Sequence, residues 1–376
     1  MAAPKTTTWA LEEHTKAKHA ILRRYLDAWI PILSHGGFPR IVFVDGFAGP
    51  GVYDDGSDGS PIIALNAYLA QAATISAEVD FHFVEVDPGR AALLKQAVDA
   101  LLASAPRCPR LKVHIHSGRG FDEVYNADIH PTLGQGVPVF AFIDPFGWRI
   151  SMATIARIMA LGSSEVLVNF MFEEINRFLA HPDQVENFDT LFGGDEWRRI
   201  ARMEGQARRN ALRDHFAERL KSVGRATHVR HFEMRNRRSQ VDYYLFFATR
   251  KRKGLVKMKE AMWKADPAGA FTFSDATDPN QMVMFGAEAD LARLEREICG
   301  RFAGEACLVS EIETFVIDET AFRDSHYKGV LKAMEKAGRL EVVAAKPRRR
   351  RGTFPEGTVV RPSPAYGGAI PLRLAL

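Results

Sequence analysis

A short apolar run at residues 41–44 leads directly into Asp45 and a glycine-rich turn at residues 46–51. Because the run has no polar face, it predicts a strand buried on both sides. Glycines in the turn let backbone N–H groups approach a ligand closely, and open α/β sheets bind nucleotides where a strand runs into such a turn. Glycines after a strand can also do no more than make a turn, so the motif needs support from the rest of the chain.

A second strand is predicted at residues 81–88 (FHFVEVDP), which end in acids, the first of them Glu85. A carboxylate at the tip of the second strand can accept two hydrogen bonds from the hydroxyls of a ribose, and we assign that role to Glu85. Asp87 precedes Pro88, and this order predicts that Asp87 caps the helix that follows.

Residues 111–116 alternate between apolar and polar side chains and predict a third strand. His114 and His116 share one face of this strand, and a His-x-His pair can hold a metal ion. No Asp, Glu or Cys close to the pair completes a site, so we predict no metal. The strand ends in a turn in which Gly118 would let the backbone approach a cofactor ring.

The fourth run, residues 139–143, is followed by Asp144, Pro145, Phe146, Gly147 and Trp148. A carboxylate at the end of a buried strand is costly unless it is paired or used. In this arrangement the carboxylate and the main chain near the proline can accept the hydrogens of a planar amine, while the phenylalanine packs on its ring. We therefore expect an amine-binding site here.

The segments around these motifs predict a doubly wound, mainly parallel sheet, because strand and helix patterns alternate along the chain. A fifth strand at residues 165–170 carries Asn169 near its tip. Residues 183–224 predict a largely helical, basic insertion. Two β-rich runs at residues 227–233 and 240–249 have a short basic connection, which predicts an antiparallel hairpin at the sheet edge.

The first strong helix pattern covers residues 8–30, where apolar side chains recur at helical spacing. Pro31 and the glycine pair after it are expected to end this helix. His14, Lys16 and Lys18 lie largely away from the apolar face, so we expect them on a solvated surface, although such a helix can also roof an active site.

The sequence divides into a Rossmann-like domain at residues 1–265, a linker at 266–286 rich in Ala, Gly, Pro and Asp, and a C-terminal domain at 287–376. The last of these has three helix patterns and a basic hairpin, which predict a winged helix-turn-helix. The tip of the hairpin carries four adjacent arginines: Arg348, Arg349, Arg350 and Arg351. Such a domain can bind a protein instead, but these arginines favour phosphate and hence nucleic acid.

The composition excludes several other classes of protein. Hydrophobic residues make up 46% and charged residues 26% of the 376 residues, which indicates a folded protein large enough for two domains. No apolar run approaches the ~18 residues of a membrane span, and the first residues lack the apolar core of a signal peptide, so we expect a cytoplasmic protein. Cys108, Cys299 and Cys307 fit neither zinc nor disulfide spacing.

Three segments resemble motifs I, II and IV of class I S-adenosylmethionine-dependent methyltransferases: FVDGFAGPG at 43–51, FVEVDP at 83–88 and FIDPFG at 142–147. Most of the chain also resembles the three-Cys-motif partner protein (TcmP) family, especially at residues 9–29, 243–250 and 254–264. That family has a C-terminal winged-helix domain. Its name records a genomic association with a separate, radical-SAM-like protein whose three-cysteine motif is not supplied by the cysteines here.

The resemblance implies S-adenosylmethionine as cofactor. The residues implied around its methionine part are Asp45, Gly46, Phe47 and Gly49, with Asp45 facing the ammonium group. Glu85 would hold the ribose, and Val86 would pack on the adenine. The acid of motif III is missing because the third strand ends in Ser117 and Gly118, and whether Asp122 takes its place is left open.

The acid-proline-aromatic order at residues 144–146 resembles that of amino-methyltransferases, although the order here is Asp-Pro-Phe-Gly instead of Asp-Pro-Pro-Tyr. We hypothesise methyl transfer to an exocyclic amino group of a nucleic acid base, with the rate gained mostly by positioning. A base in a duplex would be flipped out and would stack on Phe146 or Trp148. The implied partners are a nucleic acid and the three-Cys-motif protein.

Two other hypotheses come from different classes of protein. In the first, the chain is a non-catalytic, nucleic-acid-binding partner of the radical-SAM-like protein, and loss of Asp144 would leave function intact. In the second, Asp45, Glu85 and Asp144 are the metal ligands of a nuclease. A glycine-rich turn is unnecessary for binding a metal, which makes the nuclease the weaker hypothesis.

Overall fold

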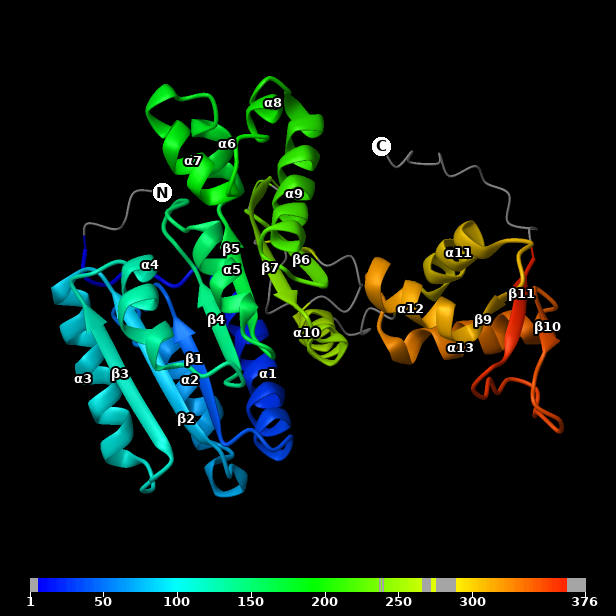
Figure 1. The fold of residues 1–376 in the computed structure, drawn as a ribbon, viewed down its shortest axis with the longest axis horizontal. Helices are drawn as coiled ribbons and strands as arrows, with labels where there is room; N and C mark the ends of the chain where they lie inside the picture. Colours follow the sequence, from blue (N-terminus) through cyan, green and yellow to red (C-terminus); the bar gives the residue numbers. More distant parts are fainter. Residues whose placement is uncertain (1–5, 237, 239, 266–271, 275–288, 364–376) are drawn as a thin grey trace. The chain divides into compact units, whose positions relative to one another are not determined.

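The computed structural model describes residues 6–236, 238, 240–265, 272–274 and 289–363. The described chain divides into two compact units (Figure 1). The first holds the described residues up to Ala265 together with Thr272–Ser274, and the second holds residues 289–363. Within the described residues, no helix has the length and apolar character needed to cross a membrane.

A mixed sheet of eight strands forms the centre of the first unit, in the order β3-β2-β1-β4-β5-β7-β6-β8. The strands are β1 (Arg40–Asp45), β2 (Glu78–Glu85), β3 (Leu111–Ser117), β4 (Val139–Ile143), β5 (Glu165–Phe170), β6 (His228–Arg235), β7 (Val241–Thr249) and β8 (Thr272–Ser274). The first five are parallel, whereas β7 runs antiparallel to both β5 and β6. The predicted doubly wound sheet with an antiparallel hairpin is confirmed.

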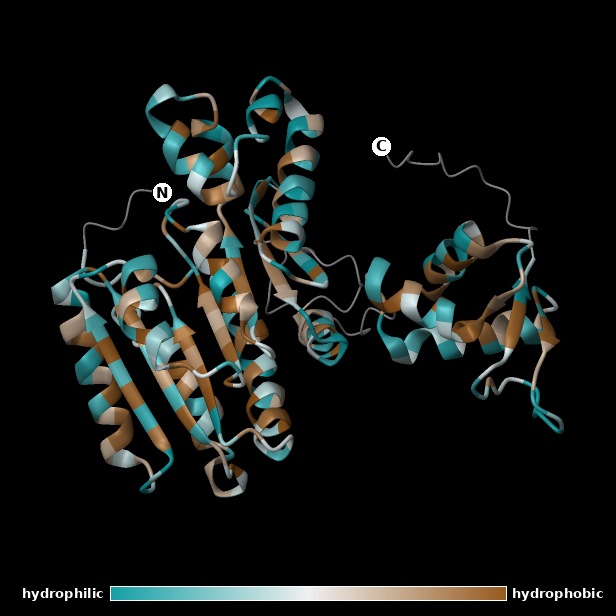
Figure 2. Ribbon diagram, viewed as in Figure 1, coloured by the Kyte–Doolittle hydropathy of each residue, from teal (hydrophilic) through white to brown (hydrophobic). Residues whose placement is uncertain are grey.

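The strand order reverses between β1 and β4, and this reversal opens a crevice at the carboxyl ends of the strands. Asp45 is in register with Phe83 on one neighbouring strand and Phe142 on the other, so three strand tips meet at one edge. Every residue of β4 is buried, as its continuous apolar run predicts. Figure 2 shows the contrast with β3, along which polar and apolar residues alternate.

Helices connect the strands and cover the sheet (Figure 1). They are α1 (Glu13–His35), α2 (Ser60–Leu69), α3 (Pro88–Ser104), α4 (Phe121–Val124), α5 (Met152–Ala160), α6 (Phe172–Phe178), α7 (Val185–Phe192), α8 (Arg198–Ala201), α9 (Gly205–Ser222) and α10 (Arg252–Ala265). Single turns lie at η1 (Ala72–Thr74), η2 (Tyr125–Ile129), η3 (His130–Thr132) and η4 (Pro182–Gln184). Helices α7 to α9 occupy the predicted helical insertion.

Both ends of the predicted first helix were wrong. Helix α1 begins at Glu13 because the residues before it are not helical, and it continues through Pro31 to His35. A proline inside a helix costs about 3 kcal/mol, but Trp29 and Ile30 are buried just before it, and their packing offsets that cost. The helix ends at a glycine pair in which Gly37 adopts φ +86°.

The second unit contains three helices and a small antiparallel sheet. Its elements are α11 (Leu291–Phe302), β9 (Cys307–Leu308), α12 (Val309–Glu319), α13 (Asp324–Lys336), β10 (Leu340–Ala344) and β11 (Val359–Pro362), with strand order β10-β11-β9. The sequence analysis missed the two-residue strand β9. It was also wrong to place Thr272–Ser274 in the linker, because these residues form β8 beside β6. Residues 266–271, 275–288 and 364–376 lie outside the described residues.

A buried carboxyl group links β5 to α1 on one face of the sheet. Glu165 accepts a hydrogen bond from the Tyr25 hydroxyl, and its Oε1 accepts another from Thr249 Oγ1 at 2.7 Å. Burial raises the pKa of Glu165 to about 7. The folded state therefore keeps a proton that the unfolded chain releases at lower pH.

The sign of this shift predicts how stability depends on pH. Because the folded pKa lies above the unfolded value, this group's contribution falls as the pH rises from about 4.5 through 7, by on the order of 3 kcal/mol in all. The side chain of Glu165→Gln stays neutral at every pH. The free energy of unfolding of this variant, minus that of wild type, should therefore increase from pH 5 to pH 8. Chemical denaturation at several pH values measures this, with Glu218→Gln on the surface of α9 as control. A difference that is constant with pH would contradict the prediction.

Candidate active site

A cavity of about 860 Å³ opens at the carboxyl ends of β1 and β2. Its wall is formed by the glycine-rich turn, the tip of β2, helix α4, the segment after β4, and helix α6. The lining residues that bear on the sequence predictions are Gly46, Phe47, Glu85, Val86, Asp122, Phe146 and Trp148. The structure therefore brings residues from five segments of the chain to one cavity.

Glu85 and Val86 lie on the wall of this cavity. The Glu85 side chain is buried, and its Oε1 accepts a hydrogen bond from the Asp87 backbone N–H at 2.8 Å. Burial raises its pKa above the usual value. Val86 is 61% exposed and offers an apolar surface beside it. The predicted cap is confirmed, since Asp87 Oδ1 accepts from the Arg90 N–H at the start of α3.

Asp45 lies beneath the turn and lines neither this cavity nor a second one described below. Its side chain is fully buried, and one oxygen accepts the Phe47 N–H at 3.2 Å. The other oxygen has no hydrogen-bond partner among the described residues, and burial raises the Asp45 pKa to about 7. Gly46 must be glycine, since an added Cβ would lie 2.7 Å from the Phe121 ring.

The sequence left open whether Asp122 takes the place of the missing acid after β3. The structure brings this residue to the cavity. Gly118 has φ +80° and donates its N–H to the Glu85 carbonyl at 3.3 Å, but it does not line the cavity. Asp122, in α4, does line it. Burial raises the Asp122 pKa, and its Oδ1 has no hydrogen-bond partner within the described part of the chain. The structure thus places this acid in the same cavity as the tip of β2.

The residues that line a second cavity, of about 320 Å³, include Asp144, Pro145, Gly49 and Asn169. Phe47 and Phe146 line both cavities and so separate them. Asn169 is buried near the tip of β5, with its side-chain amide 2.5 Å from Asp144 Oδ1. The amide therefore holds the carboxylate in place.

The other oxygen of Asp144 accepts a hydrogen bond from Lys18 Nζ at 2.5 Å. Lys18 comes from α1 and is buried, as is His14 one turn earlier, so the expectation that both lie on a solvated surface was wrong. Lys16 is exposed as expected. The lysine ammonium also lies 5.3 Å from the ring centre of Tyr243 on β7. Helix α1 therefore covers this part of the crevice.

The residues before α1 cross the glycine-rich turn in a non-helical conformation. The Trp9 ring meets Phe146 edge to face at 5.4 Å, and the Arg90 guanidinium lies over the Trp9 ring at 5.3 Å. The Trp9 carbonyl accepts the Asp54 N–H at 3.1 Å. The sequence analysis missed this role because the segment continues a helical pattern, and only the large aromatic near the start could have signalled it.

Phe146 and Trp148 differ in how freely they can meet a ligand. Phe146 is 37% exposed between the two cavities. Trp148 packs on Phe178 and Phe188 at ring distances of 5.3 Å and presents only its remaining surface to the larger cavity. Phe146 is thus the better placed of the two for stacking.

The four arginines of the wing, in the second unit, fall into two kinds. Arg349 and Arg351 bind Glu335 near the end of α13, the first through its carboxylate and the second through its carbonyl at 3.0 Å. Arg348, Arg350 and Arg351 are all exposed, but of these three only Arg351 is bound to Glu335. Arg348 and Arg350 are therefore the exposed arginines that Glu335 does not engage.

The carboxylates proposed for a nuclease do not meet. Among the described residues, Asp45, Glu85 and Asp144 do not form a group that could share a metal ion. Asp144 is paired with Lys18 instead. This geometry gives the nuclease hypothesis no site.

A family model described as a GMT-like wHTH domain matches residues 272–347. The C-terminal unit is a winged helix-turn-helix domain. Its three helices and the β10-β11 hairpin are the elements that the sequence predicted.

Solved structures similar to this chain have low identity to it. Protein LPL1258 from Legionella pneumophila is 12% identical, with 64% of this chain and 86% of that chain covered and a TM-score of 0.37. An O-methyltransferase from Bacillus cereus in complex with SAH is 9% identical, with coverage of 66% and 93% and a TM-score of 0.33. DszA carbon methyltransferase is 13% identical, with coverage of 64% and 55% and a TM-score of 0.34. No curated protein matches the chain.

The ion pair between Lys18 and Asp144 predicts that replacing Lys18 lowers the free energy of unfolding more than replacing Lys16 on the same helix. Lys18→Met leaves the half-buried carboxylate without its cation and should lower the free energy of unfolding by about 1–3 kcal/mol, less than for a fully buried pair. Lys16→Met, one half turn away and paired only at the surface, should change it by less than about 0.5 kcal/mol. Urea unfolding followed by tryptophan fluorescence measures both, and equal effects would refute the buried pair.

Proposed function

We propose that the N-terminal unit is an S-adenosylmethionine-dependent methyltransferase and that its acceptor is an exocyclic amino group of a nucleic acid base. The observation that carries the proposal is the larger cavity. There a glycine-rich turn, a carboxylate at the tip of β2 and an acid after β3 line one wall, and Phe146 lies at the boundary with Asp144. Open α/β sheets bind nucleotides in this position.

The cavity wall suits the groups of this cofactor. Glu85 is the acceptor for the ribose hydroxyls, and Val86 gives the adenine an apolar surface. Asp122 lines the cavity, and its carboxylate is an acceptor for the adenine amino group. We place the methionine part along the backbone at Gly46, which has no side chain to obstruct it, and beside Phe47. Asp45 supports the turn from below in this arrangement.

When bound, S-adenosylmethionine would supply a methyl group on a positively charged sulfur: the lone pair of an amine nitrogen would form the new N–C bond as the S–C bond breaks, leaving S-adenosylhomocysteine, and the nitrogen would lose one proton to solvent. Asp144 and the Pro145 carbonyl orient that nitrogen by accepting its hydrogens. Because Asp144 is already held by Lys18 and Asn169, its role is to position the amine. Each carboxylate oxygen has a second lone pair, so the amine can still bind. Phe146 stacks on the ring that carries the amine.

The exposed Arg348 and Arg350 of the wing are our candidates for phosphate contacts. The resemblance to the TcmP family supports a further partner, a three-Cys-motif, radical-SAM-like protein. One observation favours the non-catalytic alternative, in which the chain only binds nucleic acid for that partner. The hydrogen-bonding atoms of Asp144 are already engaged by Lys18 and Asn169.

Calorimetric titration with S-adenosylmethionine tests the cofactor site. Wild type should bind, and Glu85→Ala should bind at least about tenfold more weakly, because a hydrogen bond to a charged group contributes about 1.5–3 kcal/mol. Asp122→Asn should also bind more weakly. Glu218→Ala on the surface of α9 is the control and should bind as wild type does. No binding by wild type, or equal binding by all four proteins, would remove the cofactor site.

The wing predicts different outcomes for neighbouring arginines. The double variant Arg348→Ala/Arg350→Ala should bind DNA or RNA more weakly and should lower the slope of log affinity against log salt by about 1 to 2. Arg349→Ala should mainly destabilise the domain, since this arginine pairs with the buried Glu335. Fluorescence anisotropy at several salt concentrations measures the slope. An unchanged slope in the double variant would refute phosphate contact by the wing.

A further inference from the structure

A cluster of three side chains on β2 and β3 has no part in the proposed methyl transfer. Asp80 and His82 come from β2 and His114 from β3, and one donor atom of each lies within 4.8 Å of the others. None of the three lines either cavity. We propose that these side chains form a binding site for a divalent transition-metal ion of the zinc type.

Two donor atoms in the cluster are buried and unsatisfied. Asp80 is 1% exposed and His82 is 6% exposed. Asp80 Oδ1 and His82 Nε2 have no hydrogen-bond partner within the described residues. Leaving such buried atoms unpaired destabilises the folded state. An ion between them would satisfy both at once.

The other nitrogen of His82 has a partner that directs Nε2 toward a metal. His82 Nδ1 lies 3.1 Å from His116 Nε2, and His116 Nδ1 lies 3.8 Å from Asp128 Oδ2. If each imidazole donates toward the acid, the protons lie on both Nδ1 atoms and the lone pair of His82 lies on Nε2. Metal-binding histidines are usually oriented by such a hydrogen bond.

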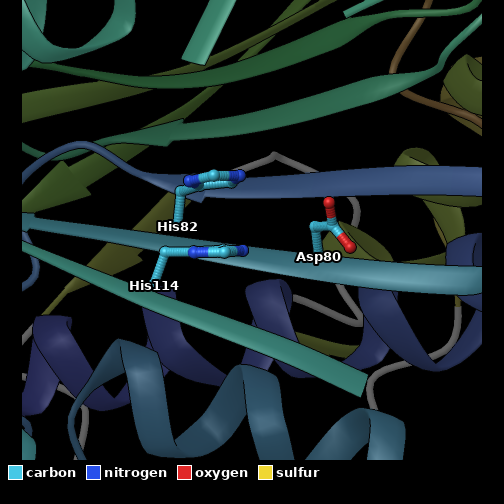
Figure 3. A group of neighbouring side chains, drawn as sticks. All are labelled: Asp80, His82 and His114. Carbon is cyan, nitrogen blue, oxygen red and sulfur yellow. The ribbon is translucent and has the colours of Figure 1, made fainter. Parts of the chain in front are cut away.

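His114 completes the cluster from the neighbouring strand. Its ring stacks on that of His82 with centres 4.5 Å apart and planes 13° apart. Figure 3 shows the two rings one above the other, both extending toward the side on which Asp80 lies. His114 is exposed, so the third ligand and a fourth, open position face solvent. Three protein ligands plus water is a common zinc arrangement.

Charged side chains around the cluster affect both its geometry and its affinity. Arg40 donates to Asp80 Oδ2 at 2.9 Å from Nε and at 2.5 Å from Nη2. These two hydrogen bonds fix the Asp80 carboxylate with Oδ1 directed away from Arg40. The positive charge of Arg40 lowers the affinity of the cluster for a cation. Lys112, on the same face of β3, is paired with Glu78 at 2.7 Å and is neutralised.

The donor set indicates which ions fit. Imidazole nitrogens favour zinc, copper, nickel and cobalt, whereas magnesium and calcium prefer oxygen ligands alone. In a tetrahedral zinc site the donors lie about 3.4 Å apart, given bonds of about 2.0–2.1 Å. The donor atoms of the cluster lie within 4.8 Å of one another, so side-chain rotations would have to bring them to this spacing. The sequence analysis rejected a metal because no acid lies near the His-x-His pair, but the fold brings Asp80 there from the next strand.

The ion would fasten an edge strand. β3 is the last strand on its side of the sheet, and the cluster bridges it to β2. Because the ligands come together only in the folded chain, the ion would stabilise the native state in proportion to the logarithm of its free concentration. This inference does not depend on the proposed methyl transfer.

The experiment is a zinc titration of the full-length, tag-free protein after treatment with a chelator. Calorimetry should give one saturable site per chain, and the melting temperature should rise with zinc. His114→Gln changes an exposed ligand that the fold does not need, and it should weaken zinc binding at least about tenfold. His35→Gln, the same change at an exposed histidine at the end of α1, should bind zinc as wild type does.

A spectroscopic measurement separates a built site from loose surface binding. Cobalt in place of zinc should give the visible absorption of a four-coordinate site in wild type and His35→Gln, and this absorption should be lost in His114→Gln. Absence of a saturable site in wild type, or binding that His114→Gln leaves unchanged, would overturn the inference.

Discussion

The ion pair between Lys18 and Asp144 joins the start of α1 to the tip of β4, and the candidate site depends on it. A carboxylate at the end of a buried strand is costly without a partner, and the lysine of a covering helix supplies one. The non-helical residues just before this helix cross the glycine-rich turn, where Trp9 meets Phe146. One pair of charges therefore fixes the roof of the crevice and the acid within it.

This constraint also defines what Asp144 can do. With Lys18 on one oxygen and Asn169 on the other, the carboxylate is held in one orientation and its charge is balanced. Such a group suits the positioning of an amine, since a rigid acceptor costs no reorganisation during the reaction. The larger cavity lies on the other side of Phe47 and Phe146, so the cofactor and the amine would approach from separate sides.

The sequence predicted what depends on local pattern. β4 and β5 have the predicted bounds because continuous apolar runs with polar ends leave little choice. The burial of Lys18 was not predictable, because its partner lies 126 residues further along the chain. The cluster at His114 was missed for a similar reason, since Asp80 reaches it only through the register of two parallel strands. Periodicity predicts on which face of the sheet a residue lies, but it does not predict which residues of the neighbouring strand lie beside it on that face.

Transfer of a labelled methyl group is the most direct measurement of the central claim. The full-length protein would be incubated with labelled S-adenosylmethionine and unmodified DNA or RNA, beside Asp144→Ala. The account predicts label in the nucleic acid with wild type and a loss of about 100-fold or more in the variant, because the amine loses the acceptor that orients it. Equal incorporation by both proteins, or cofactor binding by wild type without any transfer, would contradict the account and favour a non-catalytic nucleic-acid-binding subunit.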